Sequence, residues 1–224
     1  MEGKYYTSER SLQILIALLK AHGIKKVVAS PGTTNLTFVA SLQQDSWFEI
    51  YSAADERSAA YIAIGLCEES DEPVVISCTG ATASRNYMSG LTEAYYRKLP
   101  ILAVTSTQNP DKIGLYNSQV IDRRALPNDI ANLSVDVRAV RNEEDAAYCQ
   151  LKVNKAITEL KRRGGGPVHI NLQTLYSRDF SVKELPKVRV IQRFGLEDKL
   201  PELPNGKISI YVASHSKWSE RLTA

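Results

Sequence analysis

Three short segments of the chain combine residue types that suit ligand binding and proton transfer. They read Ser-Pro-Gly-Thr-Thr-Asn at 30–35, Ala-Asp-Glu-Arg-Ser-Ala-Ala at 54–60 and Ser-Cys-Thr-Gly-Ala-Thr-Ala-Ser-Arg-Asn-Tyr at 77–87. Small residues let a ligand approach the backbone, and a helix start offers unpaired N–H groups. A carboxyl group beside an apolar strand can share a proton, because desolvation raises its pKa. The three segments are therefore candidates for a ligand site.

Each segment also has a purely structural interpretation. Pro31-Gly32 is a common turn between a strand and a helix. Asp55 can cap a helix, and the negative charge of Glu56 can interact with the positive N-terminal end of the helix dipole. Each interaction would stabilise the helix by ~0.3–1 kcal/mol. The third segment has neither a GxGxxG fingerprint nor a GxxxxGK[ST] loop, so a dinucleotide site or a phosphate loop of the usual kind is not predicted.

Apolar runs alternate with helical patterns from residue 8 to about residue 171. We predict strands at 25–30, 48–53, 73–78, 100–105 and 167–171, and helices at 8–22, 36–43, 56–69, 79–98 and 142–163. Because most of these strands are continuously apolar, the pattern favours an α/β fold with three layers: a doubly wound, mainly parallel sheet with helices on both faces. Ligands of such sheets bind at the carboxyl ends of the strands, where all three segments lie.

Composition excludes several classes of function. The chain has 224 residues with 28 basic and 25 acidic side chains, a near balance that argues against nucleic-acid binding. Its three cysteines form no CxxC pair, which favours reduced thiols. The start does not resemble a signal peptide, and no apolar run reaches the ~18 residues of a membrane span. We therefore expect a cytoplasmic protein without a membrane or nucleic-acid partner.

The alternation of strands and helices decays after residue 172. Residues 173–205 contain three prolines among scattered charges, a composition typical of an extended linker. A strand pattern then follows at 207–213 and a helix pattern at 216–224. We expect a first domain at 1–172, a linker at 173–205 and the truncated start of a second α/β domain at 206–224.

Residues 5–172 resemble the pyrimidine-binding domain of thiamine-diphosphate-dependent enzymes. The resemblance rests on 53–61 with Gly65-Leu66, on 73–75, on 78–87 and on Gly-Pro-Val-His-Ile-Asn-Leu at 166–172. Within this family the sequence is most similar to the menaquinone-pathway branch, whose members add a decarboxylated 2-oxoglutarate unit to isochorismate. That branch shares the Asp-Glu-Arg-Ser-Ala-Ala run, the Cys-Thr segment leading to Asn-Tyr, and a loop like Gln-Val-Ile-Asp at 119–122.

The resemblance implies roles for individual residues. Glu56 would be catalytic, through a hydrogen bond to a ring nitrogen of the cofactor's aminopyrimidine, which favours loss of the proton from the thiazolium carbon. The implied cofactor-binding residues are Pro31, Gly32, Thr79, Gly80, Ala81 and Asn86, and the implied substrate-binding residues are Thr33, Thr34, Asn117 and Gln119. The implied activity is decarboxylation of a 2-oxo acid, followed by protonation or transfer of the resulting carbanion.

The sequence departs from the pattern of the menaquinone-pathway branch at three places. Thr33-Thr34 stands where that branch has Ser-Arg, so a cation for a substrate carboxylate is absent there. Gly80-Ala81 replaces Ser-Gly, and Arg123 replaces a Gln. The cofactor assignment therefore transfers better than the substrate assignment.

The half-site that binds the diphosphate does not occur in this sequence. The family holds Mg²⁺ and the diphosphate through a Gly-Asp-Gly segment with Asn-Asn about thirty residues later. We therefore expect no metal ligands in the chain, a requirement for a C-terminal diphosphate-binding domain, and a homodimer or homotetramer; the fragment alone would be inactive. Two alternatives stay open: a separate alpha subunit of a two-chain 2-oxo acid decarboxylase, and a non-catalytic α/β scaffold domain.

Overall fold

The computed structural model describes residues 5–123, 125–195, 198–199, 202 and 205–209. The chain divides into two compact units, Met1–Gln192 and Arg193–Ala224. In the second unit, residues 207–209 have no regular secondary structure, and the rest of the predicted strand 207–213 lies outside the described residues. The predicted helix 216–224 also lies outside them.

The first unit is built on one parallel sheet. The strands are β1 (Lys26–Ala29), β2 (Glu49–Ser52), β3 (Val74–Thr79), β4 (Ile101–Thr107), β5 (Leu133–Val137) and β6 (Val168–Gln173). Their order across the sheet is β2-β1-β3-β4-β6-β5, and every neighbouring pair is parallel. All the carboxyl ends therefore meet at one edge, and the predicted fold class is confirmed.

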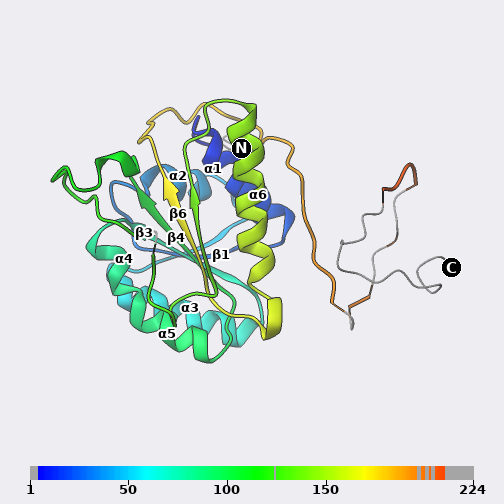
Figure 1. Ribbon diagram of the computed structural model, residues 1–224, viewed down its shortest axis with the longest axis horizontal. Coiled ribbons are helices and arrows are strands. Elements are labelled where there is room, and N and C mark those ends of the chain that lie inside the picture. The colour runs from blue at the N-terminus through cyan, green and yellow to red at the C-terminus, as the bar shows by residue number, and fades with distance from the viewer. Residues whose placement is uncertain (1–4, 124, 196–197, 200–201, 203–204, 210–224) are drawn as a thin grey trace. The chain divides into compact units, whose positions relative to one another are not determined.

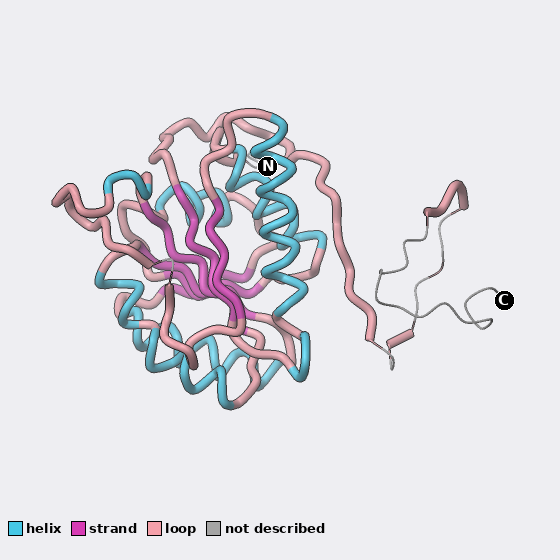
Figure 2. Tube along the Cα trace, viewed as in Figure 1, coloured by secondary structure: helices cyan, strands magenta, loops and turns pink. Residues whose placement is uncertain are grey.

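Helices cover both faces of the sheet, as Figures 1 and 2 show. One face packs against α1 (Arg10–Ala21), α2 (Leu36–Gln43) and α6 (Glu143–Glu159), and the other against α3 (Glu56–Ser70), α4 (Thr82–Asn86) and α5 (Met88–Tyr96). Val27 lies in the first core and Val28 in the second, because successive strand residues point to opposite faces. Short 3₁₀ turns follow at η1 (Pro110–Lys112) and η2 (Arg162–Gly164).

The sequence prediction missed strand β5. It is an edge strand in which Leu133, Val135 and Val137 alternate with Ser134 and Asp136, so it lacks the continuous apolar run of the inner strands. The predicted helix at 79–98 is also divided in two, since Tyr87 ends α4 and precedes α5.

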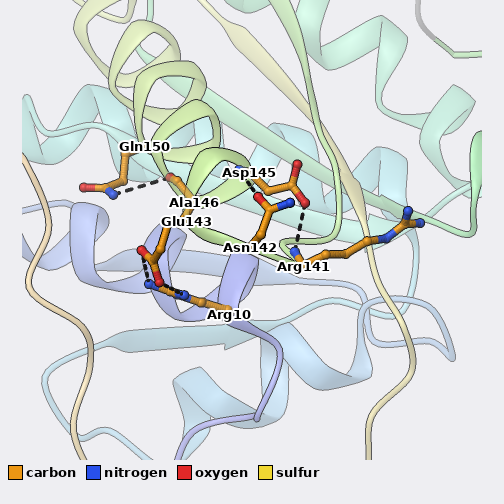
Figure 3. Close-up of polar contacts among 7 residues, drawn as sticks. All are labelled: Arg10, Arg141, Asn142, Glu143, Asp145, Ala146 and Gln150. Atoms are coloured by element: carbon orange, nitrogen blue, oxygen red, sulfur yellow. Dashed lines mark hydrogen bonds and ion pairs between the residues drawn. The ribbon is translucent and has the colours of Figure 1, made fainter.

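Helix α6 starts with a well-defined set of caps. The Asn142 side chain accepts a hydrogen bond from the Asp145 N–H at 2.8 Å, and the Asp145 carboxylate accepts one from the Arg141 N–H at 2.9 Å (Figure 3). Arg10 of α1 forms two parallel hydrogen bonds to the Glu143 carboxylate, at 2.6 and 2.9 Å. These contacts join the starts of α1 and α6, which pack side by side over the sheet.

The chain after β6 follows the surface of the first unit. The Glu9 carboxylate accepts hydrogen bonds from the N–H groups of Leu175 and Ser177, at 2.8 and 2.9 Å. Further along, the Ile191 N–H donates to the Asn154 side chain of α6 at 2.8 Å. Residues 174–191, which the sequence predicts to be linker, are thus extended chain bound to α1 and α6. No described helix is both long and apolar enough to cross a membrane.

Candidate functional site

The loops after β1 and β3 contact each other at the carboxyl edge of the sheet. The Thr34 hydroxyl donates a hydrogen bond to the carbonyl of Ser106 at 3.0 Å and accepts one from the Gly80 N–H at 3.3 Å. Asn35 supports the same loop, because its Oδ1 accepts from the Gly32 N–H at 2.8 Å. The structure therefore brings together the predicted residues of the first and third segments.

Two glycines make this close contact possible. A Cβ at Gly32 would overlap the Thr79 side chain, and a Cβ at Gly80 would lie 2.7 Å from the carbonyl oxygen of Ser106. No larger residue fits at either position without displacing backbone or side chain. Pro31-Gly32 is thus a turn between a strand and a helix, and it also lies at the carboxyl edge of the sheet, beside the candidate site.

Ala81 has a strained backbone. Its φ of 56° and ψ of −133° lie in a region that only glycine adopts easily. The residue directly follows Gly80, at the point where the chain leaves β3 and turns into α4. Strain of this kind costs of order 1–3 kcal/mol and is often found at functional sites.

Asp55 and Glu56 have separate roles at the start of α3. Asp55 caps the helix, because its Oδ2 accepts hydrogen bonds from the Ser58 N–H at 2.7 Å and the Ser58 hydroxyl at 2.6 Å, which lowers the pKa of Asp55. Glu56 is half-buried, and its Oε2 accepts a hydrogen bond from the Asn86 side chain of α4 at 3.0 Å. Among the described residues, Glu56 Oε1 has no hydrogen-bond partner. One oxygen is thus held and the other is available.

The four predicted substrate residues fall into two environments. Thr34 is buried, and its hydroxyl is used within the fold. Thr33, Asn117 and Gln119 are exposed. Asn117 and Gln119 lie on the loop that leaves the sheet after β4, seen in Figure 1 as the green extension beyond the strand ends.

Arg123, which departs from the family pattern in sequence, was not among the predicted site residues, yet it is buried at this edge. The side chain is 2% exposed, and it donates hydrogen bonds to Thr105 Oγ1 and to Asn171 Oδ1, both at 2.6 Å. Burial lowers the pKa of Arg123 to about 10, so the group stays charged at neutral pH. Thr105 and Asn171 are polar residues in buried inner strands, and such residues need polar partners, which was the available signal in the sequence.

His169 shares the Thr105 hydroxyl with this buried arginine. Its Nε2 is 2.7 Å from Thr105 Oγ1 and its Nδ1 is 2.8 Å from Ser134 Oγ. Burial, with a smaller contribution from Arg123, lowers the pKa of His169 to about 3. A ring that stays neutral with both nitrogens engaged is a structural group rather than a proton carrier.

The cysteines are also unsuited to chemistry. All three are buried and unpaired, and burial raises the pKa of Cys67 to about 11 and of Cys78 and Cys149 to about 12. They are thiols rather than thiolates at neutral pH. In the part of the chain that the structure describes, no group of three or more His, Cys, Asp or Glu side chains could hold a metal ion.

A parallel α/β domain with a glutamate and small-residue loops at its carboxyl edge has the form of a cofactor-binding domain. Residues 10–135 match the family described as "Thiamine pyrophosphate enzyme, N-terminal TPP binding domain". The chain therefore belongs to this family of domains from thiamine-diphosphate-dependent enzymes.

Two curated relatives with similar sequences carry the same name. The chain is 37% identical over 192 residues to the 2-succinyl-5-enolpyruvyl-6-hydroxy-3-cyclohexene-1-carboxylate synthase of Bacteroides thetaiotaomicron, a match that covers 84% of this chain and 34% of the relative. It is 35% identical to the synthase of the same name from Phocaeicola vulgatus, over 97% of this chain and 37% of the relative. The chain thus spans about a third of the length of these relatives.

Solved structures share the fold. A benzoylformate decarboxylase from Polynucleobacter necessarius superposes with a TM-score of 0.64 at 23% identity, over 85% of this chain and 33% of that one. A 4-hydroxybenzoylformate decarboxylase of Rhodococcus jostii RHA1 gives a TM-score of 0.61 at 20% identity, and the match covers 79% of this chain and 32% of that one. At these identities the similarity concerns architecture alone.

Proposed function

We propose that the chain supplies the pyrimidine-binding half of a thiamine diphosphate site, in an enzyme that decarboxylates a 2-oxo acid and transfers the resulting carbanion. The observation that carries this proposal is the Glu56 carboxylate, half-buried at the start of α3, with Oε2 held by Asn86 at 3.0 Å and Oε1 without a partner among the described residues. Such a group can exchange a proton with a ring nitrogen placed against it.

The residues present fit the cofactor. Thiamine diphosphate supplies, when bound, the carbon nucleophile that a 2-oxo acid needs for loss of carbon dioxide. Contacts to the pyrimidine ring would come from Pro31, Gly32 and Thr79, which are exposed or partly exposed at this edge. Gly80 and Ala81 are buried, so they would shape the loop behind the ring rather than contact it. Glu56 would hold or move the proton at the ring nitrogen, and Asn86 would orient Glu56.

Substrate contacts would come from the exposed polar residues at the same edge. We assign Thr33, Asn117 and Gln119 to this role. Thr34 is better placed to shape the loop, since its hydroxyl already bridges Ser106 and Gly80. The names of the curated relatives favour transfer of the carbanion to a second substrate over its protonation. Our proposed substrates are therefore a 2-oxo acid and a ring carboxylate acceptor that becomes a cyclohexene carboxylate when the carbanion adds to it.

The remaining parts of the site would come from outside the 224 residues. We propose a C-terminal domain that binds Mg²⁺ and the diphosphate, reached through the linker at 173–205, with residues 206–224 opening a second α/β domain. Assembly as a homodimer or homotetramer, in the cytoplasm, would complete the site.

Calorimetric titration tests this proposal on the full-length protein. Thiamine diphosphate is titrated in with and without Mg²⁺, and carbon dioxide release is then followed with 2-oxoglutarate and other 2-oxo acids, in the presence and absence of isochorismate. We expect Mg²⁺-dependent binding and turnover that requires the acceptor. Turnover without any acceptor would identify a simple decarboxylase, and activity only with a second chain would identify a two-chain enzyme. No binding would contradict the proposal and favour a scaffold domain.

A further inference from the structure

Arg123 joins the loop after β4 to three strands of the sheet. Its two terminal nitrogens donate to Thr105 on β4 and Asn171 on β6, both at 2.6 Å. Asn171 in turn donates from Nδ2 to Asp136 Oδ1 on β5 at 2.7 Å. A guanidinium presents its donors as a rigid fork, so one side chain can satisfy acceptors on two strands at once.

The charge of Arg123 is poorly compensated. Among the described residues no carboxylate contacts its guanidinium, and Asp136 is reached only through Asn171. Nε is buried and has no hydrogen-bond partner in the described part of the chain. Arg85 lies close enough to lower the pKa of Arg123 further. Burial of a charge with an unpaired donor is costly, and a neutral side chain would fill the same space without that cost. A packing role alone therefore does not account for this residue.

The position of the guanidinium connects the loop to the candidate cofactor edge. A Cβ at Gly80 would lie 3.2 Å from both Cζ and Nη2 of Arg123, so the guanidinium packs directly against the Gly80 backbone. The neighbouring loop residue is also held, because Arg85 of α4 donates to the carbonyl of Asp122 at 3.0 Å. Two arginines thus fix residues 122–123 against α4, Gly80 and strands β4 and β6, only a few residues after Asn117 and Gln119.

We propose that Arg123 is a positioning residue, whose buried fork anchors the loop that carries Asn117 and Gln119 beside Gly80 at the edge of the site. The proposal rests on the proposed function for the meaning of that edge. The geometric part of it, that Arg123 restrains the loop, is independent of cofactor and substrate. Loss of the fork would release the loop, and the substrate would then be positioned less accurately. The catalytic rate would fall, because a misplacement of about 1 Å can lower it by up to ~10²-fold.

The test compares R123M and R123K with R97K in the full-length protein. Arg97 is a matched control, because it is an exposed arginine on the edge of α5 that pairs with Glu68 and Glu93. Hydrogen–deuterium exchange is measured on peptides covering 108–122 and, separately, on peptides from β3, β4 and β6. We expect roughly tenfold faster exchange in the loop peptides of R123M, with the strands unchanged, and no change in R97K.

Kinetics provide the second readout. We expect R123M to lower kcat by about 10–100-fold with the dissociation constant of thiamine diphosphate within about threefold of wild type. R123K keeps the charge but not the fork, so it should resemble R123M. Unchanged loop exchange, or faster exchange spread over the whole sheet, would overturn the proposal, as would failure of both variants to fold. If the wild type binds no cofactor, the proposed function fails while the exchange result still decides the role of Arg123.

Discussion

Asn86 and Glu56 form the hydrogen bond that defines the candidate site, with Asn86 Nδ2 3.0 Å from Glu56 Oε2. The two residues are thirty positions apart and lie near the ends of different helices, α4 and α3. The bond fixes one carboxylate oxygen and leaves the other without a partner among the described residues. The bond therefore orients a carboxylate that sequence alone could explain as a favourable charge at a helix start, and this orientation is what the proposed acid–base role of Glu56 requires.

Replacing Glu56 tests the catalytic assignment directly. E56Q keeps the size and the contact with Asn86 but cannot share a proton with a ring nitrogen, so we expect kcat of the full-length enzyme to fall by about 10²–10⁴-fold. The control is E68Q, the same change at an exposed position of the same helix. Steady-state assays of carbon dioxide release give the comparison. Activity of E56Q within a few-fold of wild type would refute the assignment.

Ala81 offers a test of stored strain. Because its φ of 56° suits glycine, A81G should raise the free energy of unfolding by about 1 kcal/mol, the relief of strain exceeding the entropy lost. The matched control A83G lies inside α4 and should lower it by a similar amount. Chemical denaturation of both variants measures the difference. Equal destabilisation by the two glycines would show that Ala81 is not strained.

Gly80 and Gly65 should respond oppositely to alanine. G80A places a Cβ 2.7 Å from the Ser106 carbonyl oxygen and against Arg123, so we expect a loss of about 1–3 kcal/mol in the free energy of unfolding. G65A adds a methyl group to α3 where nothing lies within 4 Å, and it should stabilise by about 0.5–1 kcal/mol. Thermal melts show whether each variant is more or less stable than wild type. A neutral G80A would mean that the edge of the site adapts easily.

His169 should make the fold sensitive to acid. Its pKa is lowered to about 3 in the folded state, against about 6.5 when unfolded, so the unfolded chain binds the extra proton between these values. This contribution to stability is complete above pH 6.5 and is lost as the pH falls toward 3, by ~1.4 kcal/mol per pH unit. We expect the free energy of unfolding, measured by urea denaturation between pH 7 and pH 4, to fall less steeply with decreasing pH in H169Q than in wild type. The same pH dependence in both proteins would contradict this assignment.

Local sequence patterns were sufficient to predict the parallel α/β fold, because the periodicity of buried residues and the helix caps depend on residues that are close in the chain. Leu12, Leu15, Ile16 and Leu19 predict α1 and are all fully buried. The Asp55-Glu56 pair likewise marks the start of α3, and the segment order pointed to the cofactor family that the comparison supports. Strand β5 was missed because an edge strand alternates polar and apolar residues and lacks the continuous run of an inner strand.

Only the tertiary structure decided which polar groups meet. Asn86 reaches Glu56, the Thr34 hydroxyl bridges Gly80 and Ser106, and Arg123 is buried rather than exposed on its loop. These contacts join residues far apart in the chain, and their distances depend on how strands and loops pack in space. The sequence by itself determined the elements and the residue types at the edge of the sheet, since those follow from local propensity and burial. The fold determined which of those residues share a site, because proximity between distant residues is not encoded in local spacing.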